Sequence, residues 1–243
     1  MLLLANSLID GFLKSNGVGQ GIVVLQVLGS IAMVAAIFGK WQELSHVTRT
    51  TRRFLRDFAN GTDVLEYYLK RRPTATTGLE CIYRLTSEKL LKLLTPDVRS
   101  LVGAHRQDGE GAEPPILSNH EIDLVRSTCE HALDEEVLRV EHGMGLILTV
   151  ISIAPMLGLL GTVWGVLDAF YEMGTAGSAN LATIAPSISS ALVTTVVGLL
   201  VALPGIVAHS LLTAMVKNVT ADMEGFAAEL MVRVGRDYEG RDL

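Results

Sequence analysis

The sequence has few charged side chains, and three long stretches have none. Of its 243 residues 19% are Asp, Glu, Lys or Arg, and its mean hydropathy is +0.38. Soluble globular chains carry roughly 25% charged residues, so the composition excludes an ordinary soluble domain and favours a membrane protein. The charge-free stretches are 15–39, 143–167 and 173–216. Each exceeds the roughly 20 residues that a helix needs to cross a bilayer.

Several enzyme and binding classes also lack their motifs here. The two cysteines, Cys81 and Cys129, have no CxxC spacing, so we interpret them as packing residues and expect no metal. The glycines from 158 to 165 are not followed by the Lys-Ser or Lys-Thr of a phosphate-binding loop. An intramembrane hydrolase needs a nucleophile beside a His or an acid at membrane depth, and only His209 comes close. We therefore expect no enzyme, no cofactor and no nucleic-acid binding.

The charge-free stretches predict an all-α integral membrane protein with three transmembrane helices, long cytoplasmic helix extensions and a helical cytoplasmic loop domain. The expected transmembrane helices are 18–39, 143–167 and 184–208. The remaining parts are an outer interfacial segment (1–17), the cytoplasmic loop domain (40–142), a short outer loop (168–183) and a cytoplasmic carboxyl-terminal helix (209–243).

Basic residues set the expected orientation. One Lys precedes the first stretch, 15 basic residues lie in the loop domain and four follow the third stretch. Because Lys and Arg concentrate on the cytoplasmic side of membrane proteins, we place the amino terminus outside and the loop domain and carboxyl terminus inside. The arginines 49, 52, 53 and 56 also suit contact with anionic lipid headgroups.

Outside the spans, the pattern predicts helices. Apolar residues of 3–13 favour a short helix in the outer interface, with a frayed terminus as the alternative. Ser118 and Asn119 cap a run that meets the second stretch without a Gly or Pro break until Gly143, which predicts one helix of about 45 residues. We interpret 107–115 as a flexible link.

Small residues form one face of the second and third transmembrane helices. Such faces let helix backbones approach closely in lipid. The second helix carries Gly158, Gly161 and Gly165 with Thr162, and the third carries Ser187, Ala191, Thr194, Gly198, Ala202 and Gly205. Pro155 and Pro204 predict distorted helices whose freed carbonyls face protein or a wet cavity. On this pattern alone, a tightly packed bundle without a transport role is an equal alternative.

Hydroxyl groups at membrane depth indicate a narrow polar path. They belong to Thr162, Ser187, Ser190, Thr194 and Thr195. Such groups can border a pore without the cost of a buried charge. A proton path needs a titratable group, however, and the three expected spans hold none. If protons are the transported ion, the carboxylate must come from another subunit.

Titratable residues gather near the inner ends of the spans. Glu141, His142 and His209 are candidates for proton exchange at a cytoplasmic mouth, with solvated histidines as the alternative. The acidic residues 134–136 and Glu141 could line an inner vestibule that attracts cations. Alternatively, Glu135 pairs with Arg139 four residues on, and the others are solvated.

Two segments resemble a known family. The segments APMLGLLGTVWGV (154–166) and NLATIAPSISSALVTTVVGLLVALPG (180–205) are similar to the last two spans of the TolQ/ExbB branch of the MotA/TolQ/ExbB proton-channel family. The resemblance extends more weakly over the whole chain. The short amino terminus is more similar to TolQ than to the longer-headed ExbB proteins.

The resemblance implies a homopentamer in the bacterial inner membrane, whose second and third helices surround a TolR/ExbD-type dimer. Each such partner has a single span with a transmembrane Asp, and proton flow past it energises work at the outer membrane. By motif position, Thr162 and Thr195 border the proton path, and Pro155 and Pro186 match family prolines. Ser190 stands where the family usually has a glutamate, so no role of that glutamate transfers. A passive membrane scaffold is the alternative function.

Overall fold

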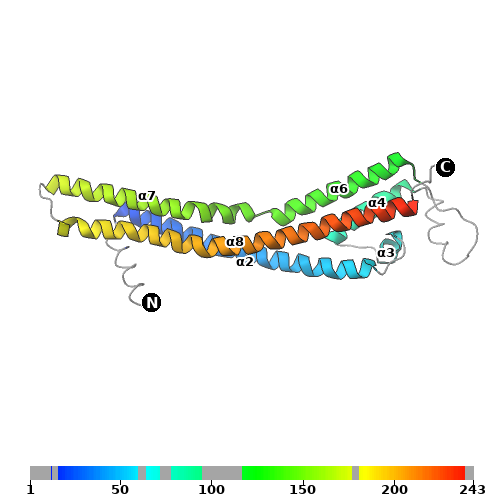
Figure 1. Cartoon of the computed structure of the whole chain (residues 1–243), viewed down its shortest axis with the longest axis horizontal. Coiled ribbons are helices and arrows are strands. Elements are labelled where there is room, and N and C mark those ends of the chain that lie inside the picture. The colour runs from blue at the N-terminus through cyan, green and yellow to red at the C-terminus, as the bar shows by residue number, and fades with distance from the viewer. Residues whose placement is uncertain are drawn as a thin grey trace, which may run out of the picture. The chain divides into compact units, whose positions relative to one another are not determined.

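The structure is a computed structural model that describes residues 12, 16–59, 64–71, 78–94, 117–176 and 181–238. Within these ranges the elements are all helices, which confirms the all-α prediction. They are α2 (Gly17–Ala59), α3 (Val64–Arg71), α4 (Leu79–Leu93), α6 (Asn119–Glu141), α7 (Met144–Ala176) and α8 (Leu181–Tyr238) (Figure 1). Helices α2, α7 and α8 are long and apolar enough to cross a membrane, as predicted. The expected interfacial helix and the flexible link lie outside the described residues, except for Phe12.

The chain divides into two compact units. Unit 1 comprises Met1–Trp41 and Gly143–Ala214, and unit 2 comprises Gln42–His142 and Met215–Leu243. Helices α2 and α8 each contribute one part to unit 1 and another part to unit 2. The predicted hydroxyl groups and a polar cavity belong to unit 1.

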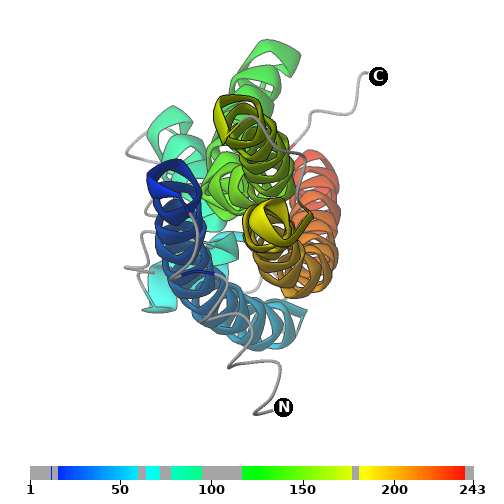
Figure 2. The same ribbon diagram turned by 90° about the vertical axis from the view of Figure 1, so that its left-hand side faces the viewer.

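Unit 1 consists of three helical segments that lie side by side: the first part of α2, all of α7 and the first part of α8 (Figures 1 and 2). Its interior contains Met33, Ile147, Ala154 and Ala202, all almost fully buried. Large apolar side chains also cover the outside of the unit, where Leu159, Val163, Leu167 and Leu203 are each about 60% exposed. A unit that is apolar inside and outside suits a lipid environment.

Unit 2 is built around aromatic side chains. Phe226 of α8 contacts Phe54 and Phe58 of α2, with ring centroids 5.3 and 5.2 Å apart. Tyr83 of α4 packs against both phenylalanines, and its hydroxyl donates a hydrogen bond to the carbonyl oxygen of Val64. Edge-to-face contacts of this kind are favourable because the positive ring edge meets the negative ring face. Unit 2 therefore has the apolar core of an ordinary helical domain.

The structure contains two helices where the sequence predicts one of about 45 residues, so that prediction is wrong. Helix α6 begins at a capping box, in which the Ser118 hydroxyl accepts from the Glu121 backbone N–H and the Glu121 carboxylate accepts from that of Ser118. It ends at Glu141. Gly143 follows with φ +86°, a left-handed conformation that glycine adopts at little cost and that ends the helix. Helix α7 starts at the next residue.

Glu136 has a structural partner at the start of α4. Its Oε2 accepts a 2.7 Å hydrogen bond from the backbone N–H of Gly78, the residue that precedes α4. Its Oε1 lies 2.9 Å from a guanidinium nitrogen of Arg139, and only 3% of the residue is exposed. A carboxylate beside a helix amino terminus is favoured by the N–H groups that point toward it. The geometry thus ties this member of the proposed vestibule into the packing of α4 on α6.

Candidate functional site

Helices α7 and α8 approach each other closely at three glycines of α7. A Cβ atom placed on Gly158 would lie 2.8 Å from the Cα of Thr195, and one on Gly165 would lie 2.5 Å from the Cβ of Ala191. Gly161 faces the Thr194 side chain even more closely. No side chain fits at such distances, so the three glycines form the surface on which α8 packs.

Two glycines of α8 serve the same purpose. A Cβ on Gly198 would lie 2.6 Å from the carbonyl oxygen of Ala154 in α7, and one on Gly205 would lie 2.7 Å from the sulfur of Met33 in α2. Small residues therefore lie at the close contacts among all three helices of unit 1.

Two of the predicted hydroxyls meet at one carbonyl group. Thr194 and Thr195 both donate to the carbonyl oxygen of Gly158, at 3.1 and 2.8 Å. Thr194 is 1% exposed, and its single hydroxyl proton is shared between Gly158 and the carbonyl oxygen of Ala191 in its own helix, which is 2.7 Å away. The half-buried Thr162 donates to Leu159, one turn earlier in α7, at 2.8 Å. Thr194 and Thr195 thus join α7 to α8, whereas the Thr162 hydroxyl bonds within α7.

Gln26 is a polar residue of this interface that the sequence analysis missed. It is 2% exposed, and its Nε2 donates to the carbonyl oxygens of Ala154 in α7, at 3.0 Å, and Thr194 in α8, at 3.2 Å. Its Oε1 is buried without a hydrogen-bond partner. An amide within a charge-free stretch is the signal that could have indicated this position, because polar side chains at membrane depth need partners.

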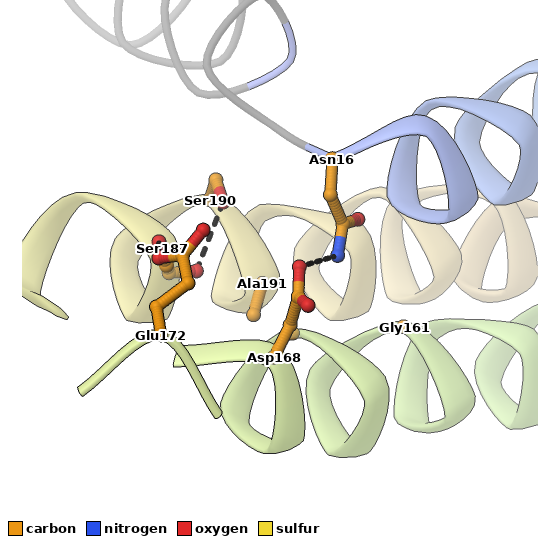
Figure 3. Close-up of a pocket in the computed structure, with 8 residues that line it drawn as sticks. Asn16, Gly161, Asp168, Glu172, Ser187, Ser190 and Ala191 are labelled. Carbon is orange, nitrogen blue, oxygen red and sulfur yellow. Dashed lines mark hydrogen bonds between the residues drawn. The ribbon is translucent and has the colours of Figure 1, made fainter. Parts of the chain in front are cut away.

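A polar cavity of about 150 Å³ lies where α2 and α8 begin and α7 nears its end (Figure 3). Its polar lining comes from all three helices. The cavity is lined by Asn16, Gly161, Gly165, Asp168, Glu172, Ser187, Ser190 and Ala191. The sequence analysis predicted Ser187 and Ser190 but not Asn16, Asp168 or Glu172.

Hydrogen bonds fix the lining of this cavity. The Oδ1 of Asn16 accepts from the backbone N–H of Gly19 at 2.9 Å, so the amide caps the first turn of α2. Its Nδ2 donates to Oδ2 of Asp168 at 2.8 Å, as Figure 3 shows. The 95%-buried Ser190 donates to the carbonyl oxygen of Ser187 at 2.9 Å, and the Ser187 hydroxyl lies 3.5 Å from Oε2 of Glu172.

The two cavity carboxylates fall within 168–183, which the sequence analysis assigned to a short outer loop. In the structure α7 continues to Ala176, so both side chains project from a helix. Residues 161, 165, 168 and 172 follow at steps of four, three and four, which places the glycines and the acids on one helix face. Extending the small-residue pattern by two steps would have found them.

The remaining predicted residues lie elsewhere. Pro155 is inside α7, and Pro186 and Pro204 are inside α8. Glu141 and His142 are exposed at the end of α6 in unit 2. His209 is a half-buried residue of α8 in unit 1, and its carbonyl oxygen accepts from the Thr213 hydroxyl at 2.9 Å.

This arrangement can hold water or pass protons between polar groups, but it offers no nucleophile with an activating base. Asp168 and Glu172 are the titratable groups among the described residues that line the cavity. Deeper along the α7–α8 interface, the polar side chains are the neutral Thr194, Thr195 and Gln26. In the described part of the chain, no three His, Cys, Asp or Glu side chains are grouped to hold a metal ion.

Comparison with known proteins gives matches over most of the chain. A family model described as the MotA/TolQ/ExbB proton channel family matches residues 103–225. The Tol-Pal system protein TolQ of Haemophilus influenzae is 28% identical over 237 residues, which cover 96% of each chain. The biopolymer transport protein ExbB of Neisseria meningitidis serogroup B is 38% identical over 218 residues, which cover 88% of this chain and 90% of the relative. Relatives with both names thus align along nearly the whole length.

Proposed function

Because the chain belongs to the MotA/TolQ/ExbB proton channel family, we propose that it is the multi-span subunit of a bacterial inner-membrane proton channel of the TolQ–TolR or ExbB–ExbD type. In this proposal a homopentamer surrounds the transmembrane helices of a single-span TolR/ExbD-type partner. The complex couples the proton motive force to mechanical work at the outer membrane. The amino terminus and the α7–α8 connection face the periplasm, and residues 40–142 and the carboxyl terminus face the cytoplasm.

The polar but uncharged interior of unit 1 carries the proposal. Thr194 and Thr195 converge on the Gly158 carbonyl group, and Gln26 lies beside them. These groups can order water or hydrogen-bond to a proton carrier, but hydroxyls and amides do not ionise at physiological pH. The proton carrier at that depth is therefore supplied in trans, by a carboxyl group on the partner's transmembrane helix.

Thr162 is one helical turn from Gly158 and Gly165 on α7 and supports the same arrangement. Its hydroxyl bonds back to Leu159, and the side chain is half-buried in the single chain. In the proposed oligomer this side of α7 faces the central partner, where a hydroxyl can exchange its hydrogen bond for one to water or to the partner's carboxyl group.

Removing individual hydroxyls distinguishes a channel from a passive scaffold. We expect Thr195→Val and Thr162→Val to lower proton flux through the reconstituted complex, whereas Thr195→Ser retains most of it. Thr149→Val is a matched control, because Thr149 is an exposed α7 residue that donates to Gly145 at 2.8 Å. All variants should assemble with the partner, as judged by size-exclusion chromatography. Wild-type flux in both valine variants would contradict the role given to these hydroxyls, and no flux through the wild-type complex would favour the scaffold.

A further inference from the structure

The polar cavity of unit 1 has a feature that a packing role does not require. Asp168 and Glu172 are one turn apart on the same face of α7, and both line the cavity. Like charges at this spacing destabilise a helix, and ionisable residues within membrane-spanning helices are usually functional. Helix stability therefore does not explain why the cavity contains two carboxyl groups.

The hydrogen bonds to Asn16 hold Asp168 in one orientation. Because the Asn16 Oδ1 accepts from the Gly19 N–H, its Nδ2 is the atom that points at Asp168. The Asp168 Oδ2 accepts this bond, and Oδ1 is the carboxylate oxygen that does not accept from Asn16. Asn16 thus couples the cap of α2 to the position of an α7 carboxyl group (Figure 3).

One of the threonines packs directly against the lining of the cavity. Gly161 lines the cavity, and its missing side chain leaves the Thr194 hydroxyl group directly against it. Thr194 in turn shares the Gly158 carbonyl group with Thr195. Carboxyl groups, serine hydroxyls and threonine hydroxyls therefore follow one another along the α7–α8 interface.

We propose that this cavity is the periplasmic mouth of the proton path, with Asp168 as the side chain that takes up the proton and Asn16 as the residue that positions it. The inference rests on the proposed proton-channel function and its orientation. A proton from periplasmic water binds the Asp168 carboxylate and leaves along the hydroxyl-lined interface toward the carboxyl group of the partner.

The charges around Asp168 are few. Of the described residues that line the cavity, α7 contributes Glu172 as the second carboxylate. The neutral residues are Asn16, which caps α2, and Ser187 and Ser190 of α8. Glu172 is exposed, so it is the outer of the two acids and can raise the local proton concentration without being required for uptake.

The test measures proton flux through liposomes that contain the full chain with its single-span partner, in sodium-free buffer and under an imposed pH gradient. Replacing Asp168→Asn should lower flux about tenfold or more, as expected when a positioned proton-transfer group is lost. Asp168→Glu should retain flux, and Asp222→Asn, an exposed acid in the unit 2 part of α8, is the matched control. The double variant Asp168→Asn, Ser190→Glu returns a carboxyl group to the cavity from α8 and should regain flux.

Asn16→Ser separates the two bonds of Asn16. Serine also caps helices well, so the start of α2 is retained while the donor to Asp168 is lost. This variant should shift the outside pH at which flux is half-maximal without changing assembly. An unchanged pH profile would show that Asn16 is only a helix cap.

Water access provides a readout that does not depend on transport. In right-side-out vesicles a membrane-impermeant thiol reagent should label Ser187→Cys but not Ser152→Cys, which lies at an exposed position in the first third of α7, far from the cavity. The native Cys81 and Cys129 are buried in unit 2 and serve as the unlabelled background.

The outcomes separate the two proposals. No flux through the wild-type complex would contradict the proposed function itself. Wild-type flux that persists in Asp168→Asn, failure of both carboxyl-restoring variants, or equal labelling of the two cysteine variants would overturn the assignment of the cavity while leaving the channel function in place.

Discussion

The hydroxyl of Thr195 donates a 2.8 Å hydrogen bond to the carbonyl oxygen of Gly158, so α8 and α7 are joined at a glycine. Apolar contact adds little to helix association in lipid, because the lipid is itself apolar. Unit 1 is therefore held together by close packing and by hydrogen bonds between its helices. The glycine both admits the neighbouring backbone and exposes the carbonyl group that the threonines use.

The first prediction concerns this close approach. Gly158→Ala should destabilise the protein by about 1–3 kcal/mol, because the added Cβ would overlap the Thr195 backbone and the helices would have to separate. Gly145→Ala is the matched control on the same helix, since nothing lies within 4 Å of its Cβ position. Thermal unfolding of the detergent-solubilised chain checks both. Equal unfolding midpoints in the two variants would refute the packing argument.

The second prediction concerns Gln26. Replacing it with Met keeps the approximate size but removes two interhelical hydrogen bonds, so we expect a loss of about 1 kcal/mol. Gln42→Met, at an exposed position of α2, should leave stability unchanged. The same unfolding measurement applies. The buried Oε1 of Gln26 has no hydrogen-bond partner, which offsets part of the stability that its two hydrogen bonds provide. If Gln26→Met stabilises the protein, the expected loss is wrong and the buried amide serves function rather than stability.

The third prediction concerns the thiols of unit 2. Burial raises the pKa of Cys129, and Cys81 is shifted in the same direction by burial and by the nearby charge of Glu136. Both thiols should therefore resist iodoacetamide at pH 8 and react once the protein is unfolded, because the thiolate is the reactive form. Because the thiol pKa is higher in the folded protein than in the unfolded chain, the folded state is favoured while the thiols are protonated. This contribution to the free energy of unfolding should be lost as the pH rises above about 9, the thiol pKa of the unfolded chain. Rapid labelling of the native protein would contradict the buried placement.

The sequence predicts the helical class and the three apolar spans because charge-free runs of that length have few alternatives. It does not predict where helices end. The break between α6 and α7 depends on the left-handed backbone conformation of Gly143, which its neighbours select. From the sequence alone, a single glycine between a polar and an apolar segment is compatible with a continuous helix or with a break.

The cavity could not be predicted from the charge-free stretches either. The bond between Asn16 and Asp168 joins residues 152 positions apart. Ser187 and Ser190 could be predicted as polar groups on a small-residue face, but their proximity to Asp168 and Glu172 depends on α7 remaining helical beyond the apolar run. The periodic pattern of glycines and acids is present in the sequence, but residues 168–183 were assigned to a loop, whereas α7 continues to Ala176.

The most direct measurement of the central claim is proton uptake in liposomes that hold this chain alone, with the TolR/ExbD-type partner, and with that partner carrying Asn in place of its transmembrane Asp. We predict flux only with the intact partner, because the described interior of unit 1 supplies hydroxyls and an amide but no titratable group at the depth of Thr194 and Thr195. Flux through this chain alone, or undiminished flux with the altered partner, would contradict a channel whose carboxyl group is supplied in trans.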